Sequence, residues 1–445
     1  MSQETTRGAW RTAFSYSLGS LGNNIIFAFI STYLLIFYTD VFGISAASVA
    51  ILFLVARIWD GINDPIMGMI VDNTHTRWGK FRPYLFFVPI IMGLATVACF
   101  LNPNLSDQGK LIYAYVTYIA WGMSFTAMDI PYWSMTASIT RDMDTRSKVI
   151  TVSRTMAFVG FLVANVITLP LTSQIGWGLT ALVFSISSLL LTWFTFFTVK
   201  ENYTVPRKEK QSFKGAIELF RVNKPLRMII YNLLIFDLID KFRFSFSVFY
   251  LKYNIGADEL MISVFMGLYL IFMIAGSILS PFISRKLGKK RTAILGYVLN
   301  IISGIGMFAT GYDSLVLMLA WASVGSIGTG MANIATMTML TDTVEYGQYK
   351  TGHRSEGMIF SANIFRVKVA SAIGGALGAY ALSRIGYVPN VVQSQAVLTQ
   401  MHWIFTLIPG VLYSLCIIPL FFYGLTEERY AEIVEALANQ EEVAV

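Results

Sequence analysis

The stretch VARIWDGINDPIMG, residues 55–68, places four polar side chains, Arg57, Asp60, Asn63 and Asp64, in a segment that is otherwise apolar. The residues just before it, ISAASVAILFL at 44–54, carry no charge. Burying a carboxylate or a guanidinium in a hydrophobic helix is costly, and such groups usually face the interior of a helix bundle or a water-filled path. The stretch therefore indicates a functional site inside a membrane helix.

The composition of the whole chain agrees with a membrane protein. Of 445 residues, 55% are hydrophobic and only 13% are charged, whereas about 25% are charged in a typical soluble domain. Uncharged runs long enough to cross a bilayer recur along the sequence. The N-terminal sequence has no short apolar core followed by a small-residue cleavage site, so we expect the first hydrophobic segment to remain as a span. The predicted class is an all-α integral membrane protein.

Hydropathy predicts twelve membrane helices, at about 20 residues per span. The expected domains are an N-terminal six-helix bundle at 1–199, a central cytoplasmic loop at 200–227, a C-terminal six-helix bundle at 228–425 and a cytoplasmic tail at 426–445. The expected spans are 13–38, 46–72, 82–101, 111–139, 148–172, 178–199, 228–252, 261–284, 291–310, 315–342, 355–386 and 397–425.

The basic residues predict the orientation. With these spans, 24 of the 33 Lys and Arg residues fall on one side of the membrane, and only Lys110, Lys252 and Arg384 lie near the other. The side rich in Lys and Arg is normally cytoplasmic, so both termini are expected there. The net charge of +7 is then a topology signal beside the anionic inner leaflet of the bilayer, and we expect no nucleic acid partner.

A repeat relates the two halves. GMIVDNTHTRWGKFR at 68–82 follows the second span, and SRKLGKKR at 284–291 follows the eighth. Each combines glycine with closely spaced basic residues, six spans apart. Parallel six-span repeats are a feature of major facilitator transporters, in which the substrate site lies between the halves near the bilayer midplane. We therefore predict a major facilitator fold that works by alternating access.

The second span contains the first candidate site. Asp60 and Asp64 are four residues apart and share a helix face, with Asn63 beside them and Arg57 one turn before Asp60. Pro65 lacks an N–H and frees a backbone carbonyl oxygen. Carboxylate and amide oxygens suit a hard monovalent cation or a shared proton. The alternative is an Arg57–Asp60 ion pair that only fixes packing, which leaves Asp64 without an assigned partner.

The fourth span contains a second polar face. Thr126, Asp129 and Trp133 recur at spacings of three and four residues, so they lie on one side of the helix. A carboxylate accepts hydrogen bonds from neighbouring sugar hydroxyls, and an indole offers a flat apolar surface to a sugar ring. Arg154 in the fifth span is the expected counter-charge for Asp129. Lys368 in the eleventh span is expected to approach the carboxylates from the other half.

Two further charged groups favour structural or gating roles. In the seventh span, Asp237 and Lys241 have the spacing of an i, i+4 ion pair. The segment 341–357, which closes the tenth span, contains Asp342, Glu345 and Arg354. Charges of both signs there fit salt bridges that hold the cytoplasmic side closed, and a solvated loop is an equally good interpretation.

Five stretches together resemble one known family. They are FLVARIWDGINDPIMG, RWGKFRP, WGMSFTAMDIPYWS, DTVEYG and GYVPNVVQS, in the same order over nearly the whole chain. This pattern is similar to the glycoside–pentoside–hexuronide:cation symporters, typified by melibiose permease. The resemblance implies a bacterial cytoplasmic membrane protein that takes up a sugar with Na⁺, Li⁺ or H⁺, works as a monomer and has no other cofactor.

The resemblance also implies roles for single residues. By motif, Asp60, Asn63, Asp64 and Thr126 match the family's cation site, with Asp60 and Asp64 as Na⁺ ligands. Asp129, Trp133 and Arg154 match its sugar site, and Lys368 matches a lysine close to both. In the first span this chain has Asn23 and Asn24 where melibiose permease has a lysine–aspartate pair, and Phe125 replaces a tyrosine. These departures leave a galactoside, pentoside, β-glycoside or hexuronide open, with Asn23 and Asn24 as candidate sugar ligands.

The sequence fits three other classes of function less well than it fits sugar symport. A lysolipid carrier of the same fold needs an apolar cleft, which the polar face of the fourth span argues against. A membrane enzyme is not expected, because His75, His353 and His402 form no nucleophile–histidine–acid pattern and no P-loop is present. A sugar sensor that does not transport would have no need of the paired acids.

Overall fold

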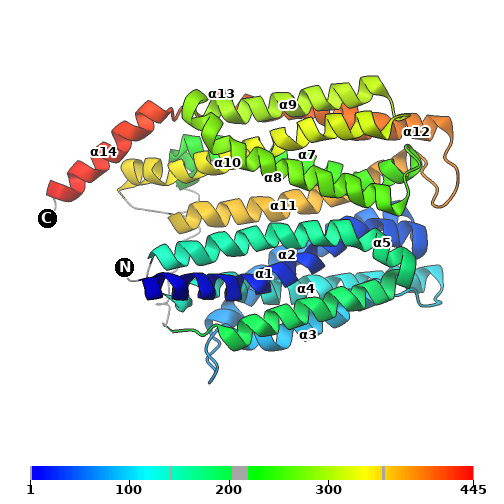
Figure 1. The fold of residues 1–445 in the computed structure, drawn as a ribbon, viewed down its shortest axis with the longest axis horizontal. Helices are drawn as coiled ribbons and strands as arrows, with labels where there is room; N and C mark the ends of the chain where they lie inside the picture. The colour runs from blue at the N-terminus through cyan, green and yellow to red at the C-terminus, as the bar shows by residue number, and fades with distance from the viewer. Residues whose placement is uncertain (1–2, 141–142, 203–218, 353–355, 444–445) are drawn as a thin grey trace. The chain divides into compact units, whose positions relative to one another are not determined.

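The computed structural model describes residues 3–140, 143–202, 219–352 and 356–443. Within these ranges the chain forms helices and loops, apart from one isolated bridge between Thr76 and Gly79, and the helices of each half run side by side (Figure 1). The helices are α1 (Gln3–Ile36), η1 (Phe37–Val41), α2 (Ala46–Asp72), α3 (Arg82–Cys99), α4 (Asp107–Ile139), α5 (Met143–Thr198), α7 (Lys224–Tyr253), α8 (Glu259–Leu287), α9 (Lys289–Thr310), α10 (Leu315–Thr351), α11 (Glu356–Arg384), α12 (Gln395–His402), η2 (Trp403–Leu407), α13 (Ile408–Phe421) and α14 (Glu427–Val443).

These helices account for the twelve predicted spans. Nine candidate spans in the described residues are long and apolar enough to cross a membrane. One of them, α5, contains two spans, because Gly176 breaks the helix with φ 78° and ψ 167°. The helices α7 and α11, which carry charges in their interiors, complete the set. The predicted all-α, twelve-helix membrane fold is confirmed.

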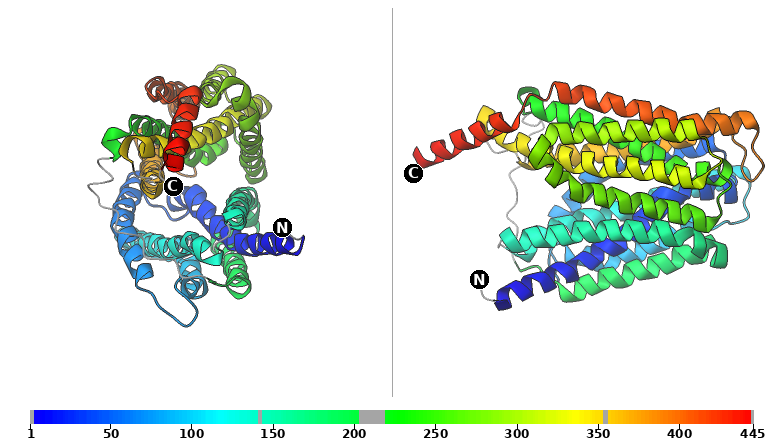
Figure 2. Two further views of the ribbon diagram at one scale, coloured as in Figure 1. Left: turned by 90° about the vertical axis from the view of Figure 1, so that its left-hand side faces the viewer. Right: turned by 45° about the horizontal axis from the view of Figure 1, so that its top comes forward.

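The structure differs from the predicted boundaries in several places, three of which follow. The helix α10 continues to Thr351, past the predicted end at 342. The predicted central loop is partly helical, since residues 219–222 are helical and α7 begins at Lys224. The predicted tail forms α14, in which Ile433 is buried, and Figure 2 shows it extending past the other helices of its half. The apolar spacing of Tyr430, Ile433 and Leu437 is the helical signal in this tail.

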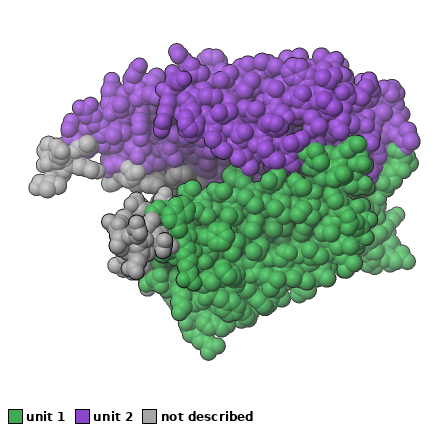
Figure 3. Space-filling model, viewed as in Figure 1, with its two compact units in different colours: residues 1–207, 258–264, 388–391 green, residues 208–257, 265–387, 392–445 purple. Residues whose placement is uncertain are grey.

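The chain divides into two compact units, coloured separately in Figure 3. Unit 1 comprises residues 1–207, 258–264 and 388–391, and unit 2 comprises 208–257, 265–387 and 392–445. In unit 1, α1 packs closely on α5, and a Cβ at Gly160 would lie 2.5 Å from the carbonyl oxygen of Leu21. In unit 2, Gly276 of α8 and Gly330 of α10 bring the two helix backbones into contact.

In both units a glutamate caps the N-terminus of the third helix, and this shared feature supports the repeat seen in the sequence. In unit 1, Glu201 follows α5 and accepts backbone N–H groups at the start of α3, from Lys80, Phe81 and Arg82 at 3.0, 2.7 and 2.9 Å. In unit 2, Glu427 accepts the N–H of Lys289 at the start of α9, at 2.6 Å. Each carboxylate therefore caps a helix N-terminus, where negative charge is stabilising.

A glycine precedes each of these caps. Gly79 has φ +112° and Gly288 has φ +84°, and a Cβ would lie 2.5 Å and 2.9 Å, respectively, from an oxygen of the capping glutamate. Each loop needs a residue without a side chain, because a Cβ would displace the carboxylate. The same sequence element thus builds the same turn after the second helix of each unit.

Candidate cation and sugar sites

The acidic cluster of α2 is organised by hydrogen bonds from α2 and α4. Arg57 Nη1 lies 3.0 Å from Asp60 Oδ2, and its Nη2 lies 3.3 Å from the hydroxyl of Tyr118. Thr126 Oγ1 donates to Asp64 Oδ1 at 3.0 Å. The guanidinium therefore compensates Asp60, and the hydroxyl of Thr126 orients Asp64. Two carboxylates with a neutral hydroxyl beside them form an oxygen-rich cluster of the kind that a hard cation prefers.

Two residues beside the acidic cluster, Gly122 and Asn63, favour a small ligand. Gly122 of α4 stands against Asp60, and a Cβ there would lie 3.1 Å from Asp60 Oδ1. The side chain of Asn63 is buried, and within the described part of the chain its Nδ2 has no hydrogen-bond acceptor. No hydrogen bond of this nitrogen holds the amide in one orientation, so its oxygen can turn toward a cation. Carboxylate, amide and hydroxyl oxygens are the ligands that a hard cation prefers.

The second polar face of α4 contains a stacked trio. Trp133 Nε1 donates to Asp129 Oδ1 at 3.0 Å. The guanidinium carbon of Arg154 lies 4.4 Å from the centre of the Trp133 ring. Arg154, the expected counter-charge for Asp129, is close enough to act on it electrostatically, and its guanidinium also covers the indole in a cation–π contact. The guanidinium therefore covers one face of the indole.

The two asparagines of α1 have different surroundings. Asn23 is 2% exposed, and its Oδ1 has no partner among the described residues. Asn24 is half-buried and donates to the carbonyl oxygen of Ser20 at 2.9 Å. The helical twist separates the side chains by about 100°, so the pair does not form one binding surface. Their roles as sugar ligands stay predictions.

In unit 2 the predicted Asp237–Lys241 pair is wrong. Asp237 Oδ2 lies 2.6 Å from Arg366 Nη1 on α11, and Lys241 Nζ lies 3.8 Å from Asp240 Oδ2. The helix spacing permits the predicted pair, but a buried arginine on a facing helix offers a shorter contact. Lys368, also on α11, is half-buried, and its approach to the carboxylates of unit 1 stays a prediction.

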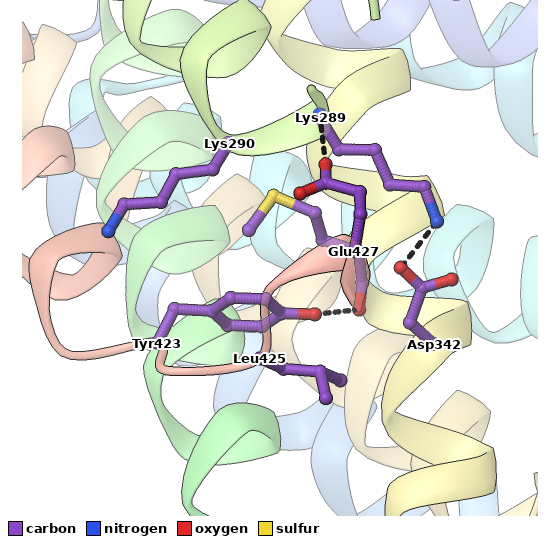
Figure 4. A pocket seen from close by; sticks show the side chains of 7 residues that line it. Lys289, Lys290, Asp342, Tyr423, Leu425 and Glu427 are labelled. Carbon is purple, nitrogen blue, oxygen red and sulfur yellow. Dashed lines mark hydrogen bonds and ion pairs between the residues drawn. The ribbon is translucent and has the colours of Figure 1, made fainter. Parts of the chain in front are cut away.

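The acids near the end of α10 lie in the helix and not in a loop. Asp342 Oδ2 lies 2.6 Å from Lys289 Nζ at the start of α9, beside the Glu427 cap (Figure 4). Glu345, one turn further on, is half-buried. Arg354, the third predicted member of this group, lies outside the described residues. The Asp342–Lys289 pair joins two helices of one unit, so it braces that unit.

Comparisons with known proteins agree with this fold. A family model described as MFS/sugar transport protein matches residues 15–427. The chain is 35% identical over 428 residues to the isoprimeverose transporter of Lactiplantibacillus pentosus, covering 93% of this chain and 88% of that protein. It is 31% identical over 444 residues to the glucuronide carrier protein homolog of Escherichia coli strain K12, covering 98% and 97%. The solved structure of a D-xylose–proton symporter superposes with a TM-score of 0.67 at 14% identity, covering 94% of this chain and 98% of that one.

The fold and the polar clusters define a multi-pass membrane transporter of the major facilitator type, and not an enzyme. Within that class, the chain belongs to the MFS/sugar transport family and is a member of the glycoside–pentoside–hexuronide:cation symporter type. The predicted family is confirmed, and the family model together with the two relatives named above supports sugar transport.

Sequence reasoning missed several members of these sites. Tyr118 and Gly122 of α4 complete the acidic cluster, but nothing in an isolated helix sequence shows which residue faces a neighbouring helix. Arg366 and Asn363 complete the Asp237 site. Arg366 was visible as a charge inside a span, and that signal finds a site without identifying its partner.

Proposed function

We propose that this protein is a Na⁺-coupled sugar symporter, with the cation at Asp60, Asn63, Asp64 and Thr126 and the sugar at Asp129 and Trp133. The observation that carries this proposal is the hydrogen bond from Thr126 to Asp64. Thr126 and Asp129 lie one turn apart on α4, a rise of about 4.5 Å. The helix α4 therefore contributes both to the proposed cation site, through Thr126, and to the proposed sugar site, through the carboxylate of Asp129.

This arrangement gives a physical basis for coupling. A cation bound by Asp64 would also be coordinated by the hydroxyl oxygen of Thr126. This coordination would fix the rotation of α4 at the turn that contains Thr126. Asp129 and its partner Trp133 follow on the same helix face, so the cation favours one arrangement of the sugar ligands. Since coupling between two sites is reciprocal, the sugar tightens the cation by the same factor.

Na⁺ is favoured over H⁺ by the neutral oxygens of the cluster. A proton needs one carboxylate, whereas Na⁺ uses the additional oxygens of Asn63 and Thr126. Arg57 is paired with Asp60, and the carboxylate of Asp64 is the anionic ligand proposed for Na⁺. The bacterial relatives and the excess of Lys and Arg on one side support a carrier in the bacterial cytoplasmic membrane with both termini in the cytoplasm, and we propose that it acts as a monomer.

The test is uptake of labelled glycosides into proteoliposomes under a Na⁺ gradient or a pH gradient. The parent is compared with Asp64→Asn and with Arg384→Gln, an exposed position at the end of α11 that serves as the control. We expect Na⁺ to stimulate uptake of at least one glycoside, and we expect that stimulation to be lost only in Asp64→Asn. Stimulation by the pH gradient alone would replace Na⁺ with H⁺, and a parent that moves no glycoside under either gradient would refute sugar symport.

A further inference from the structure

A pair of buried tyrosines joins α1 to α4 within unit 1. Tyr16 of α1 and Tyr132 of α4 are 0% and 1% exposed, and their rings stack with centroids 4.6 Å apart. The hydroxyl of Tyr132 donates to the backbone carbonyl oxygen of Tyr16 at 2.7 Å, and the hydroxyl of Tyr16 donates to the backbone carbonyl oxygen of Tyr132. Each side chain therefore binds the backbone of the other helix, so the tyrosine pair fixes the two backbones relative to each other.

The packing around the tyrosine pair is close. Gly19, about one turn after Tyr16, stands against the ring of Tyr132, and a Cβ there would lie 2.8 Å from its Cε2 atom. The hydroxyl oxygen of Ser153 on α5 lies 3.5 Å from the hydroxyl of Tyr132. The position of the Tyr132 ring is therefore set by contacts with α1 and α5.

Tyr132 directly follows the point where α4 is weakened. Pro131 lies inside α4 and has no N–H, so the helix lacks the hydrogen bond that another residue would donate there to the carbonyl oxygen of Ala127. Asp129 and Trp133, the proposed sugar ligands, lie on either side of Pro131 and are joined by a hydrogen bond of 3.0 Å. Because helices bend most readily at proline, a contact with another helix is needed to hold these two ligands in one arrangement.

The tyrosine pair provides this contact. Tyr132 precedes Trp133 in the chain, and their rings meet edge to face with centroids 5.4 Å apart. On α1, Tyr16 lies seven residues before Asn23, which is about two helical turns. The tyrosine pair therefore sets the register between the two helices that carry the candidate sugar ligands.

We propose that Tyr16 and Tyr132 are positioning residues for sugar binding, which hold α1 and α4 in the arrangement in which Asp129 and Trp133 bind the sugar. Both tyrosines are buried, so they act through these ligands and not by touching the sugar. This inference rests on the proposed sugar transport and adds to it the contact that keeps the sugar site assembled. When a site is assembled in only a fraction of the molecules, its apparent affinity falls in proportion to that fraction.

The test removes single hydroxyl groups and keeps every ring. Tyr16→Phe and Tyr132→Phe each delete one hydrogen bond of the tyrosine pair. The matched control is Tyr33→Phe, because Tyr33 also lies on α1, is 0% exposed and donates to the backbone carbonyl oxygen of Asn165 at 2.8 Å. That hydrogen bond joins α1 to α5 and leaves α4 untouched.

Three quantities are measured on the full-length protein in nanodiscs. The first is the affinity, at saturating Na⁺, for whichever p-nitrophenyl glucoside, galactoside, xyloside or glucuronide the parent binds most tightly. The second is the affinity for radioactive Na⁺ without sugar, and the third is the unfolding temperature.

We expect Tyr16→Phe and Tyr132→Phe to weaken glycoside binding about fivefold, the effect of one lost hydrogen bond. Na⁺ binding without sugar should stay at the parental affinity, because Thr126 lies on the other side of Pro131 from the tyrosine pair. Tyr33→Phe should lower the unfolding temperature about as much as the other two variants and bind the glycoside as the parent does.

Parental glycoside affinity in either Tyr16→Phe or Tyr132→Phe would overturn the inference. So would equal weakening of glycoside binding in Tyr33→Phe, or equal weakening of Na⁺ binding, since the hydroxyls would then act through general stability. If the phenylalanine variants do not fold, Gly19→Ala decides, because it displaces the Tyr132 ring and keeps both hydroxyls: weaker glycoside binding with parental Na⁺ binding supports the inference, and parental affinity for both overturns it. A parent that binds none of the four glycosides would refute the proposed sugar transport itself, and this inference with it.

Discussion

The helix interiors of the two units carry charge of opposite sign. In unit 1, the interiors of α2, α4 and α5 contain one more acid than base, whereas in unit 2 the interiors of α7 and α11 contain two more bases than acids. The residues are Asp60, Asp64, Asp129, Arg57 and Arg154 in unit 1, and Asp237, Asp240, Lys241, Arg243, Arg366 and Lys368 in unit 2.

This difference shows that related helix bundles can be specialised through a few buried charges. Both units use the same capping turn after their second helix, with Glu201 and Glu427 in matching positions. Their scaffolds therefore correspond, while their polar interiors do not. An acidic interior suits a cation, and the cation site is proposed in the unit whose helix interiors are acidic.

The largest expected effect separates two buried arginines of unit 2, Arg366 and Arg243. Arg366→Leu strands Asp237 without its partner, and removing one member of a buried ion pair costs about 3–5 kcal/mol. Arg243 forms no ion pair with the described residues, so Arg243→Leu strands no carboxylate, and we expect its stability to equal or exceed that of the parent. Thermal unfolding of both variants in detergent measures the difference. Equal destabilisation would mean that Arg243 is a packing residue and would remove the contrast.

The next prediction concerns the net charge that moves across the membrane when one Na⁺ and one sugar are transported together. With one Na⁺ moved per sugar, a neutral glycoside brings one positive charge across the membrane and a glucuronide brings none. A potential of 100 mV acts on one charge with about 2.3 kcal/mol, equivalent to roughly fiftyfold in accumulation.

We therefore expect an inside-negative potential, set with K⁺ and valinomycin in proteoliposomes, to raise the steady-state accumulation of p-nitrophenyl β-D-glucoside and to leave that of the glucuronide unchanged. The same liposomes without a potential are the control. An equal response of the two sugars would contradict a stoichiometry of one Na⁺ per sugar.

The third prediction concerns the helix caps that the two units share. Glu201 accepts three backbone N–H groups in the described contacts and Glu427 accepts one. Replacing a cap costs about 1–2 kcal/mol, and a neutral amide accepts more weakly than a carboxylate. Glu201→Gln should therefore lower the unfolding temperature more than Glu427→Gln. The reverse order would contradict the expectation that the number of accepted N–H groups decides how much each cap stabilises the protein.

The sequence predicted helices and charges better than it predicted partners. Runs of apolar residues located the spans because the bilayer imposes their length, and the spacing of Asp60 and Asp64 located a polar face because a helix repeats every 3.6 residues. Partners on other helices depend on how those helices pack, which no local pattern encodes. For that reason Asp237 was assigned to Lys241 on its own helix, and its contact with Arg366 was missed.

The contact of Arg154 with Trp133 was missed for a similar reason. An arginine near an aspartate and a tryptophan can pair with the carboxylate or cover the ring, and the residue types fit both arrangements. The helix α14 is a different case, because its apolar spacing was present in the sequence. A short amphipathic helix after the last span lacks the hydrophobicity that identifies a membrane helix, so hydropathy alone passes over it.

The smallest expected effect concerns two glycines beside the acidic cluster of unit 1. At Gly122, a Cβ would lie 3.1 Å from Asp60 Oδ1, whereas at Gly61 nothing lies within 4 Å of a Cβ. Gly122→Ala must push Asp60 by a few tenths of an ångström, and mild overpacking costs about 1 kcal/mol. We expect it to weaken the Na⁺ dependence of uptake about fivefold, with Gly61→Ala matching the parent.

Sugar affinity at saturating Na⁺ should be the same in both glycine variants, because the added methyl group touches the cation cluster and not Asp129. Na⁺ titrations of glycoside binding separate the two quantities. A Gly122→Ala variant with parental Na⁺ dependence and weakened sugar affinity would move Asp60 from the cation site to the sugar site. The acidic interior of unit 1 would then bind the sugar through Asp60 as well as through Asp129.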